Sequence, residues 1–125
     1  REVDTVVPAN KMVSLIQHVK SIGKKYGFKS VCYGHAGNGN IHVNILKDNI
    51  DEAQWHNILK NAVGEIFDEV IRLGGSLSGE HGIGILNKEF MSKQFTEVEL
   101  GLMRGIKKVF DPKSIMNPGK IFPEY

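Results

Sequence analysis

Apolar residues recur every three or four positions in three stretches of the chain, which is the period of an amphipathic helix. The first stretch predicts a helix over residues 10–25, which Gly27 can end. The second is the longest, and it follows a capping box at residues 51–54. The third follows another capping box, at residues 96–99, and ends at the Asp111-Pro112 pair.

Short runs of β-forming residues lie between these helices and predict four strands. The runs cover residues 5–7, 28–35, 40–46 and 76–78. In chain order the elements read strand, helix, strand, strand, helix, strand, which is the βαββαβ order of a ferredoxin-like fold. We therefore expect an α+β protein with an antiparallel sheet and additional C-terminal helices, forming one domain over residues 1–125.

Histidines and asparagines gather in residues 34–44, GHAGNGNIHVN, where a glycine-rich turn runs into an alternating strand. An antiparallel hairpin around this turn would set His35 opposite His42 and place Asn44 on the same face. Directly opposed residues have Cβ atoms about 5 Å apart, so the two imidazoles could share one metal ion. The alternative is an ordinary solvated turn without a ligand.

A second polar cluster, residues 74–84, reads GGSLSGEHGIG and sets a carboxylate beside an imidazole among five glycines. Two histidines and a carboxylate with an open position form a typical site for a catalytic divalent metal, and His35, His42 and Glu80 could supply it. His81 would remain free as a general base, because imidazole exchanges protons near neutral pH. The alternative is a strained connector without chemistry.

The overall composition excludes several classes of protein. A net charge of +2 with 24% charged residues, and no run of Lys or Arg, argues against a nucleic-acid partner. No stretch approaches the ~20 apolar residues of a transmembrane helix. The single cysteine, Cys32, excludes an internal disulfide and is typical of a reducing compartment.

Four local motifs together resemble the C-terminal part of the FAD-linked oxidases and dehydrogenases that act on D-2-hydroxy acids. The motifs are residues 4–8 (DTVVP), 34–42 (GHAGNGNIH), 78–84 (SGEHGIG) and 111–120 (DPKSIMNPGK). They occur in the order of the family and span nearly the whole chain. This group includes the flavin subunit of glycolate oxidase, D-lactate dehydrogenases and D-2-hydroxyglutarate dehydrogenase, within the vanillyl-alcohol-oxidase superfamily.

The resemblance implies oxidation of a D-2-hydroxy acid to the 2-oxo acid and assigns a role to each cluster. By this likeness His35, His42 and Glu80 bind a divalent metal, zinc or manganese. Asn44 and His81 contact the substrate, and His81 is the base that removes the hydroxyl proton.

The resemblance also implies partners and a cofactor. FAD would be bound mainly by an N-terminal domain that this chain lacks, with Asn117 near the flavin, so the chain alone should not turn over substrate. The expected partners are a small 2-hydroxy acid, the FAD domain of the same polypeptide, an electron acceptor and a second copy in a homodimer. We expect the protein to lie in the cytoplasm, where it could bind to the periphery of the inner membrane, or in the mitochondrion of a eukaryote.

One departure from the family bears on the substrate. Members that act on 2-hydroxyglutarate have a lysine just before the motif at residues 4–8, where this chain has Glu2. A monocarboxylate such as lactate or glycolate is therefore favoured over a diacid.

Two other classes of function stay open on the sequence alone. A non-catalytic ferredoxin-like module could bind a ligand or a partner through the polar face of its sheet. A metal-dependent hydrolase is the other alternative, because two histidines and a carboxylate also serve zinc hydrolases.

Overall fold

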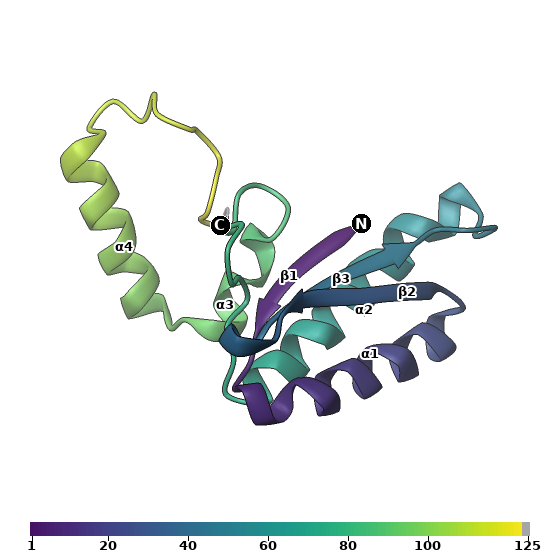
Figure 1. Cartoon of the computed structure of the whole chain (residues 1–125). Coiled ribbons are helices and arrows are strands. Elements are labelled where there is room, and N and C mark those ends of the chain that lie inside the picture. Colours follow the sequence, from purple (N-terminus) through teal and green to yellow (C-terminus); the bar gives the residue numbers. More distant parts are fainter. Residues whose placement is uncertain (124–125) are drawn as a thin grey trace. The chain divides into compact units, whose positions relative to one another are not determined.

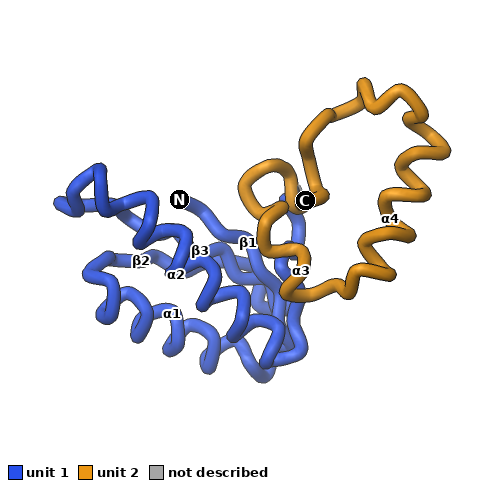
Figure 2. Tube along the Cα trace, turned by 180° about the vertical axis from the view of Figure 1, so that it is seen from behind, with its two compact units in different colours: residues 1–81 blue, residues 82–125 orange. Residues whose placement is uncertain are grey.

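The computed structural model describes residues 1–123 as an α+β chain whose internal contacts form two compact units. The first unit is Arg1–His81 and the second begins at Gly82 (Figure 2). Each unit is described by itself below.

Unit 1 contains the predicted sheet and the two long helices (Figure 1). Its elements are β1 (Glu2–Val6), a 3₁₀ turn η1 (Ala9–Lys11), α1 (Met12–Tyr26), β2 (Lys29–His35), a 3₁₀ turn η2 (Ala36–Asn38), β3 (Asn40–Leu46) and α2 (Glu52–Arg72). Gly27 ends α1 in the left-handed conformation, and the Asp51 side chain caps α2 by accepting the Ala53 N–H at 2.8 Å.

The three strands pair antiparallel in the order β1-β3-β2, so the predicted α+β class and antiparallel sheet are confirmed. The predicted fourth strand is reduced to one bridge, in which Ser76 pairs with Val6 on the outer side of β1. Its position beside β1 is the one that a ferredoxin-like sheet gives its last strand. The ladder stops there because the chain turns and donates the next hydrogen bonds to the Asp4 side chain instead.

The core of unit 1 lies between the sheet and the two helices, which cover the same face of the sheet (Figure 1). The strands contribute alternate apolar residues, as period two requires, while each helix contributes one stripe. The buried members are Val3, Ile41, Val43 and Ile45 from the strands, Leu15, Val19 and Ile22 from α1, and Val63, Ile66, Phe67 and Val70 from α2. Because the helices take one face, the polar residues of the strands are left on the other, which we call the open face.

The hairpin register differs from the prediction by two residues. His42 lies opposite Tyr33, and His35 lies opposite Asn40. The prediction was wrong because Asn40 already pairs with His35, so the connection contains only the η2 turn and Gly39, which is in the left-handed conformation. A shift of two residues keeps every side chain on its predicted face, so His35 and His42 are still neighbours, now on the diagonal.

Unit 2 is helical, with η3 (Lys88–Phe90), α3 (Met91–Gln94) and α4 (Glu97–Phe110). The predicted capping box is confirmed, since Thr96 and Glu99 exchange side-chain to backbone hydrogen bonds. Of the α4 residues only Leu100 is buried. Across residues 1–123, no helix has both the length and the apolar character needed to cross a membrane.

Candidate functional site

The candidate site lies on the open face of the unit 1 sheet, where the strand register sets polar side chains in rows. His42 on the central strand β3 lies between Asp4 of β1 and Tyr33 of β2. In the next row Glu2 of β1 lies opposite Asn44 of β3. These side chains point to one side because their strands alternate faces with period two.

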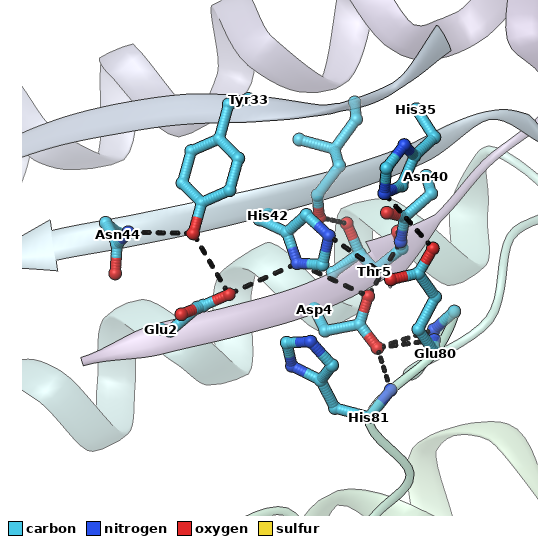
Figure 3. Close-up of polar contacts among 12 residues, drawn as sticks. Glu2, Asp4, Thr5, Tyr33, His35, Asn40, His42, Asn44, Glu80 and His81 are labelled. Atoms are coloured by element: carbon cyan, nitrogen blue, oxygen red, sulfur yellow. Dashed lines mark hydrogen bonds and ion pairs between the residues drawn. The ribbon is translucent and has the colours of Figure 1, made fainter. Parts of the chain in front are cut away.

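His42 is the centre of the site, and its side chain is only 5% exposed. Its ring stacks on Tyr33 with 5.2 Å between ring centroids, and the ring of His81 lies 4.9 Å away (Figure 3). The ring of His35 meets it edge-on at 6.0 Å. The structure therefore brings together all three histidines that the sequence selected.

The segment after Ser76 reaches this face by folding onto the Asp4 carboxylate. One oxygen, Oδ2, accepts the Ser78 hydroxyl at 2.9 Å and the backbone N–H groups of Gly79, Glu80 and His81 at 2.9, 2.7 and 2.8 Å. Successive backbone N–H groups around one anion form a nest of the kind that binds phosphates elsewhere. Here the anion belongs to the protein, and it places the Glu80 and His81 side chains at the site (Figure 3).

The hydrogen bonds keep Asp4 ionised although its side chain is buried. Burial opposes the charged form, but the backbone N–H groups of His81 and Glu80 and the side chains of Asn40 and Ser78 outweigh it. The pKa of Asp4 is lowered from 3.8 to about 2.

A glycine is needed where the loop passes closest to the sheet. A Cβ on Gly79 would lie 2.4 Å from Asn40 Nδ2 and 3.1 Å from Asp4 Oδ1. Asn40 cannot easily retreat, because its Nδ2 also donates to Asp4 at 2.7 Å and to the Thr5 carbonyl at 3.0 Å. Gly79, within the glycine-rich residues 74–84, thus allows the close approach of the loop backbone to the sheet.

The predicted metal ligands have donor atoms close enough to share an ion. His35 Nε2 lies 3.4 Å from Glu80 Oε1, and His42 Nε2 lies 3.6 Å from Glu80 Oε2. All the donor atoms of this set lie within 4.8 Å of one another. Ligands held ~2.1 Å from a tetrahedral ion stand about 3.4 Å apart, so these separations are compatible with a cation between the three residues.

The surroundings of His42 also favour a cation. Its Nδ1 lies 3.2 Å from Glu2 Oε1 and 3.8 Å from Asp4 Oδ1, while its Nε2 faces Glu80. Within residues 1–123, the buried Nδ1 has no partner with hydrogen-bonding geometry. A neutral imidazole has one N–H, so one ring nitrogen must face a carboxylate with its lone pair. A metal ion on that nitrogen, or a second proton on the ring, removes the repulsion.

A second set of donors, Glu2, His42 and His81, also lies within 4.8 Å. The two sets share His42, whose ring nitrogens face different carboxylates. The spacing of residues had suggested only the set with His35 and Glu80.

Sequence reasoning gave no role in the site to Asp4 or Tyr33, and it connected Glu2 only with the choice of substrate. Tyr33 donates to Glu2 Oε1 at 3.2 Å and accepts from Asn44 Nδ2 at 3.3 Å. The predicted strand began at Thr5, whereas β1 begins at Glu2, so both acids lie on the strand and face the site. The signal was present, because the acids alternate with Val3 and Thr5, but two acids lower the β propensity.

Asn117, the residue expected near the flavin, lies in unit 2. It has a left-handed backbone, with φ of 50°, and its side chain accepts from Lys120 Nζ at 2.8 Å. The same segment is held by the Asp111 carboxylate, which accepts the backbone N–H groups of Ile115 and Met116 at 3.0 Å each. A cofactor role for Asn117 stays a prediction.

Comparison with known proteins agrees with the resemblance that the four motifs carry. The family model for the C-terminal domain of FAD linked oxidases matches residues 2–121. The chain therefore belongs to the FAD-linked oxidases, and it corresponds to their C-terminal domain. The resemblance carried by the four motifs is confirmed.

Several curated relatives are oxidoreductases of hydroxy acids by name. The chain is 34% identical over 120 residues to a D-lactate dehydrogenase of Anaerostipes hadrus, covering 96% of this chain and 25% of that protein. It is 34% identical over 121 residues to glycolate oxidase subunit GlcD of Bacillus subtilis, covering 95% and 25%. It is 36% identical over 122 residues to a D-2-hydroxyglutarate dehydrogenase of Stutzerimonas stutzeri, covering 95% and 26%. The chain thus spans about a quarter of the length of these relatives.

Proposed function

We propose that this chain is the substrate- and metal-binding region of an FAD-dependent enzyme that oxidises a D-2-hydroxy acid to the 2-oxo acid. The observation that carries the proposal is the convergence of His35, His42, Glu80 and His81 on the open face, in a chain of the FAD-linked oxidase family. Family membership alone would support only a link to FAD. The residues of the site support the binding and deprotonation of a substrate.

His35, His42 and Glu80 are the residues that would hold a divalent cation, with Zn²⁺ or Mn²⁺ as the preferred ions for this donor set. Such a cation supplies positive charge for the carboxylate and hydroxyl oxygens of the substrate and makes the hydroxyl more acidic. FAD, held mainly by another part of the polypeptide, supplies the acceptor for the hydrogen and electron pair that leave the α-carbon.

The remaining residues of the site act on the substrate itself. His81 accepts the hydroxyl proton at a ring nitrogen. Its ring packs beside His42, which places it at the site, and its side chain is exposed, so a substrate can reach it. Asn44 borders the same face through its contact with Tyr33 and offers an amide to the substrate. Tyr33 also stacks on His42 and so keeps the central ring in one orientation.

The Glu2 carboxylate favours a monocarboxylate substrate of the lactate or glycolate type. It borders the site, 3.2 Å from His42 Nδ1, and its side chain is 37% exposed. An acid at this position repels a second carboxylate on the substrate. The same proposal includes an electron acceptor as a partner and a second copy of the chain in a homodimer. It also includes a location in the cytoplasm or the mitochondrion.

The test uses the full-length protein that contains this chain. We expect a bound divalent metal and flavin reduction by D-lactate or glycolate. His81→Ala should lower kcat about 10² to 10⁴-fold without lowering the metal content, whereas Glu80→Gln should lower the metal content. A matched control is His56→Ala, because His56 is an exposed residue of α2 whose ring contacts Glu52; we expect it to change neither.

Full activity in the His81→Ala protein would overturn the role of His81 as the base. A parent protein whose flavin no hydroxy acid reduces would overturn the proposed activity. Metal without flavin would instead favour the hydrolase, and neither metal nor flavin would favour a non-catalytic binding module. If Glu2→Gln releases the metal and Glu80→Gln does not, the ion belongs to Glu2, His42 and His81.

A further inference from the structure

The Asp4 carboxylate joins three distant parts of unit 1. It lies on β1, accepts from Asn40 at the start of β3, and accepts from residues 78–81, which lie 74 to 77 positions further along the chain. The side chain is 3% exposed. Residues 79–81 lie outside every helix and strand, so no helical or sheet ladder holds their backbone.

We propose that Asp4 is a positioning residue, which fixes residues 78–81 in the shape that presents Glu80 and His81 before any metal or substrate binds. The inference rests on the proposed function of those two side chains. Both are exposed and extend from a short irregular segment, so without an anchor their directions would vary. Three consecutive N–H groups bound to one carboxylate oxygen restrict that backbone to one conformation.

Asp4 is suited to this role and not to binding the metal directly. Four donors already surround its Oδ2, more than the two lone pairs of that atom. Its Oδ1 accepts from Asn40 at 2.7 Å. The carboxylate therefore has little capacity left for a cation, while its charge strengthens each bond that it accepts.

The experiment compares variants of the 125-residue chain in two measurements. Amide hydrogen exchange, followed by NMR in metal-free buffer, reports the order of residues 79–81. Calorimetric titration with Zn²⁺ reports the affinity of the site. The variants are Asp4→Asn, which keeps the shape and removes the charge, and Ser78→Ala, which removes one donor. Asp111→Asn is the matched control, because Asp111 is also a buried carboxylate that accepts two backbone N–H groups, but in unit 2.

We expect Asp4→Asn to reduce the protection of the amides of residues 79–81 at least about tenfold while the amides of Ile41 and Val43 keep theirs. The Kd for Zn²⁺ should rise about 10 to 100-fold, as for other outer-shell partners. Ser78→Ala should raise it about threefold, and Asp111→Asn should leave it within about twofold.

A folded Asp4→Asn chain with unchanged protection at residues 79–81 and an unchanged Kd would overturn the inference. If that variant does not fold, Ser78→Ala decides, and unchanged values there also overturn it. If the parent chain binds no Zn²⁺, the metal part of the proposed function fails. The exchange measurement still tests the anchor in that case, so the two failures are distinguishable.

Discussion

Asp4, Asn40 and His42 are polar side chains buried on the face of the sheet that the helices do not cover. Burying such groups is unfavourable unless their hydrogen bonds are satisfied, and apolar residues in their place would stabilise the sheet more simply. Two of their atoms, Asn40 Oδ1 and His42 Nδ1, have no hydrogen-bond partner in the described part of the chain. Unsatisfied buried atoms of this kind are typical of sites that complete their bonding with a ligand.

The ionised Asp4 predicts a specific loss of stability in acid. Its pKa is about 2 in the folded chain, against 3.8 for an unperturbed aspartate, so the folded state favours the charged form. The resulting stabilisation, about 2 kcal/mol, is fully present above pH ~4 and is lost as the pH falls toward 2. The measurement is urea denaturation of the metal-free chain. The excess in unfolding free energy of the parent over Asp4→Asn should decrease as the pH falls from 5 to 2, because of the same linkage.

Taking the difference between the two proteins removes the contributions of other acids, such as Glu65 and Asp111, whose pKa values are also lowered by their partners. A difference in unfolding free energy that stays constant from pH 5 to pH 2 would contradict the assignment of the low pKa to Asp4.

Glu2 predicts how the choice of substrate can be changed. In the full-length protein, Glu2→Lys replaces a repelling charge by an attracting one beside the site. The ratio of kcat/KM for D-2-hydroxyglutarate to that for D-lactate should then rise about tenfold or more, the effect of roughly 1.4 kcal/mol. Glu2→Gln, which only removes the charge, should give a smaller rise, and an unchanged ratio in Glu2→Lys would exclude Glu2 from substrate selection.

At the scale of elements, the β2-β3 hairpin is the part whose geometry the site depends on most. The η2 turn and Gly39 set the register that puts His42 between Asp4 and Tyr33. Gly39 has a φ of 70° and also contacts the residue that follows β1, since its carbonyl accepts the Val7 N–H at 3.0 Å. A register change of one residue would move the histidines to the helix-covered face.

Two alanine substitutions in this turn should therefore differ in effect. A Cβ on Gly39 would lie 1.9 Å from the Val7 carbonyl oxygen, whereas one on Gly37 would have no atom within 4 Å. We expect Gly39→Ala to reduce the free energy of unfolding by at least ~2 kcal/mol, and Gly37→Ala to change it by less than ~0.5 kcal/mol. Urea denaturation midpoints measure both changes, provided that the m-value is unchanged. Equal midpoints for the two variants would show that the turn can accommodate a side chain at Gly39 without a loss of stability.

At the scale of the whole molecule, unit 1 contains both the buried core of sheet and helices and every residue of the candidate metal site. A piece of this size can bury enough apolar surface to fold, because it is larger than the smallest independent domains. Unit 2 contributes the helix α4 and the segment with Asn117, which the family resemblance connects with the flavin.

The division of the chain into two compact units predicts that residues 1–81 alone fold and bind metal. Their circular dichroism should show a cooperative unfolding transition, and their Kd for Zn²⁺ should lie within about threefold of the value for the 125-residue chain, because no ligand is lost. The same fragment with Glu80→Gln is the control that should lose binding. A fragment that is unfolded, while the 125-residue chain binds Zn²⁺, would show that unit 2 is required for the site.

Much of the fold could be predicted because its signals are local. The stripes of α1 and α2 and the alternation of Ile41 and Val43 depend on residues a few positions apart, as do the caps at Gly27 and Thr96. The same alternation placed His42 and Asn44 on one face. The start of β1 was missed because Glu2 and Asp4 are weak strand formers, and pairing with β3 overrides that preference.

The sequence by itself determined the order of the elements, the face to which His35 and His42 belong and the membership in the FAD-linked oxidases. Only the tertiary structure decided the hairpin register, the return of residues 78–81 onto Asp4 and the neighbours of His42. The physical reason is separation along the chain: periodicity and caps are set by neighbouring residues, whereas Glu80 meets His35 and His42 only when the whole of unit 1 has folded. The chemistry of this site thus depends on contacts that no local pattern encodes.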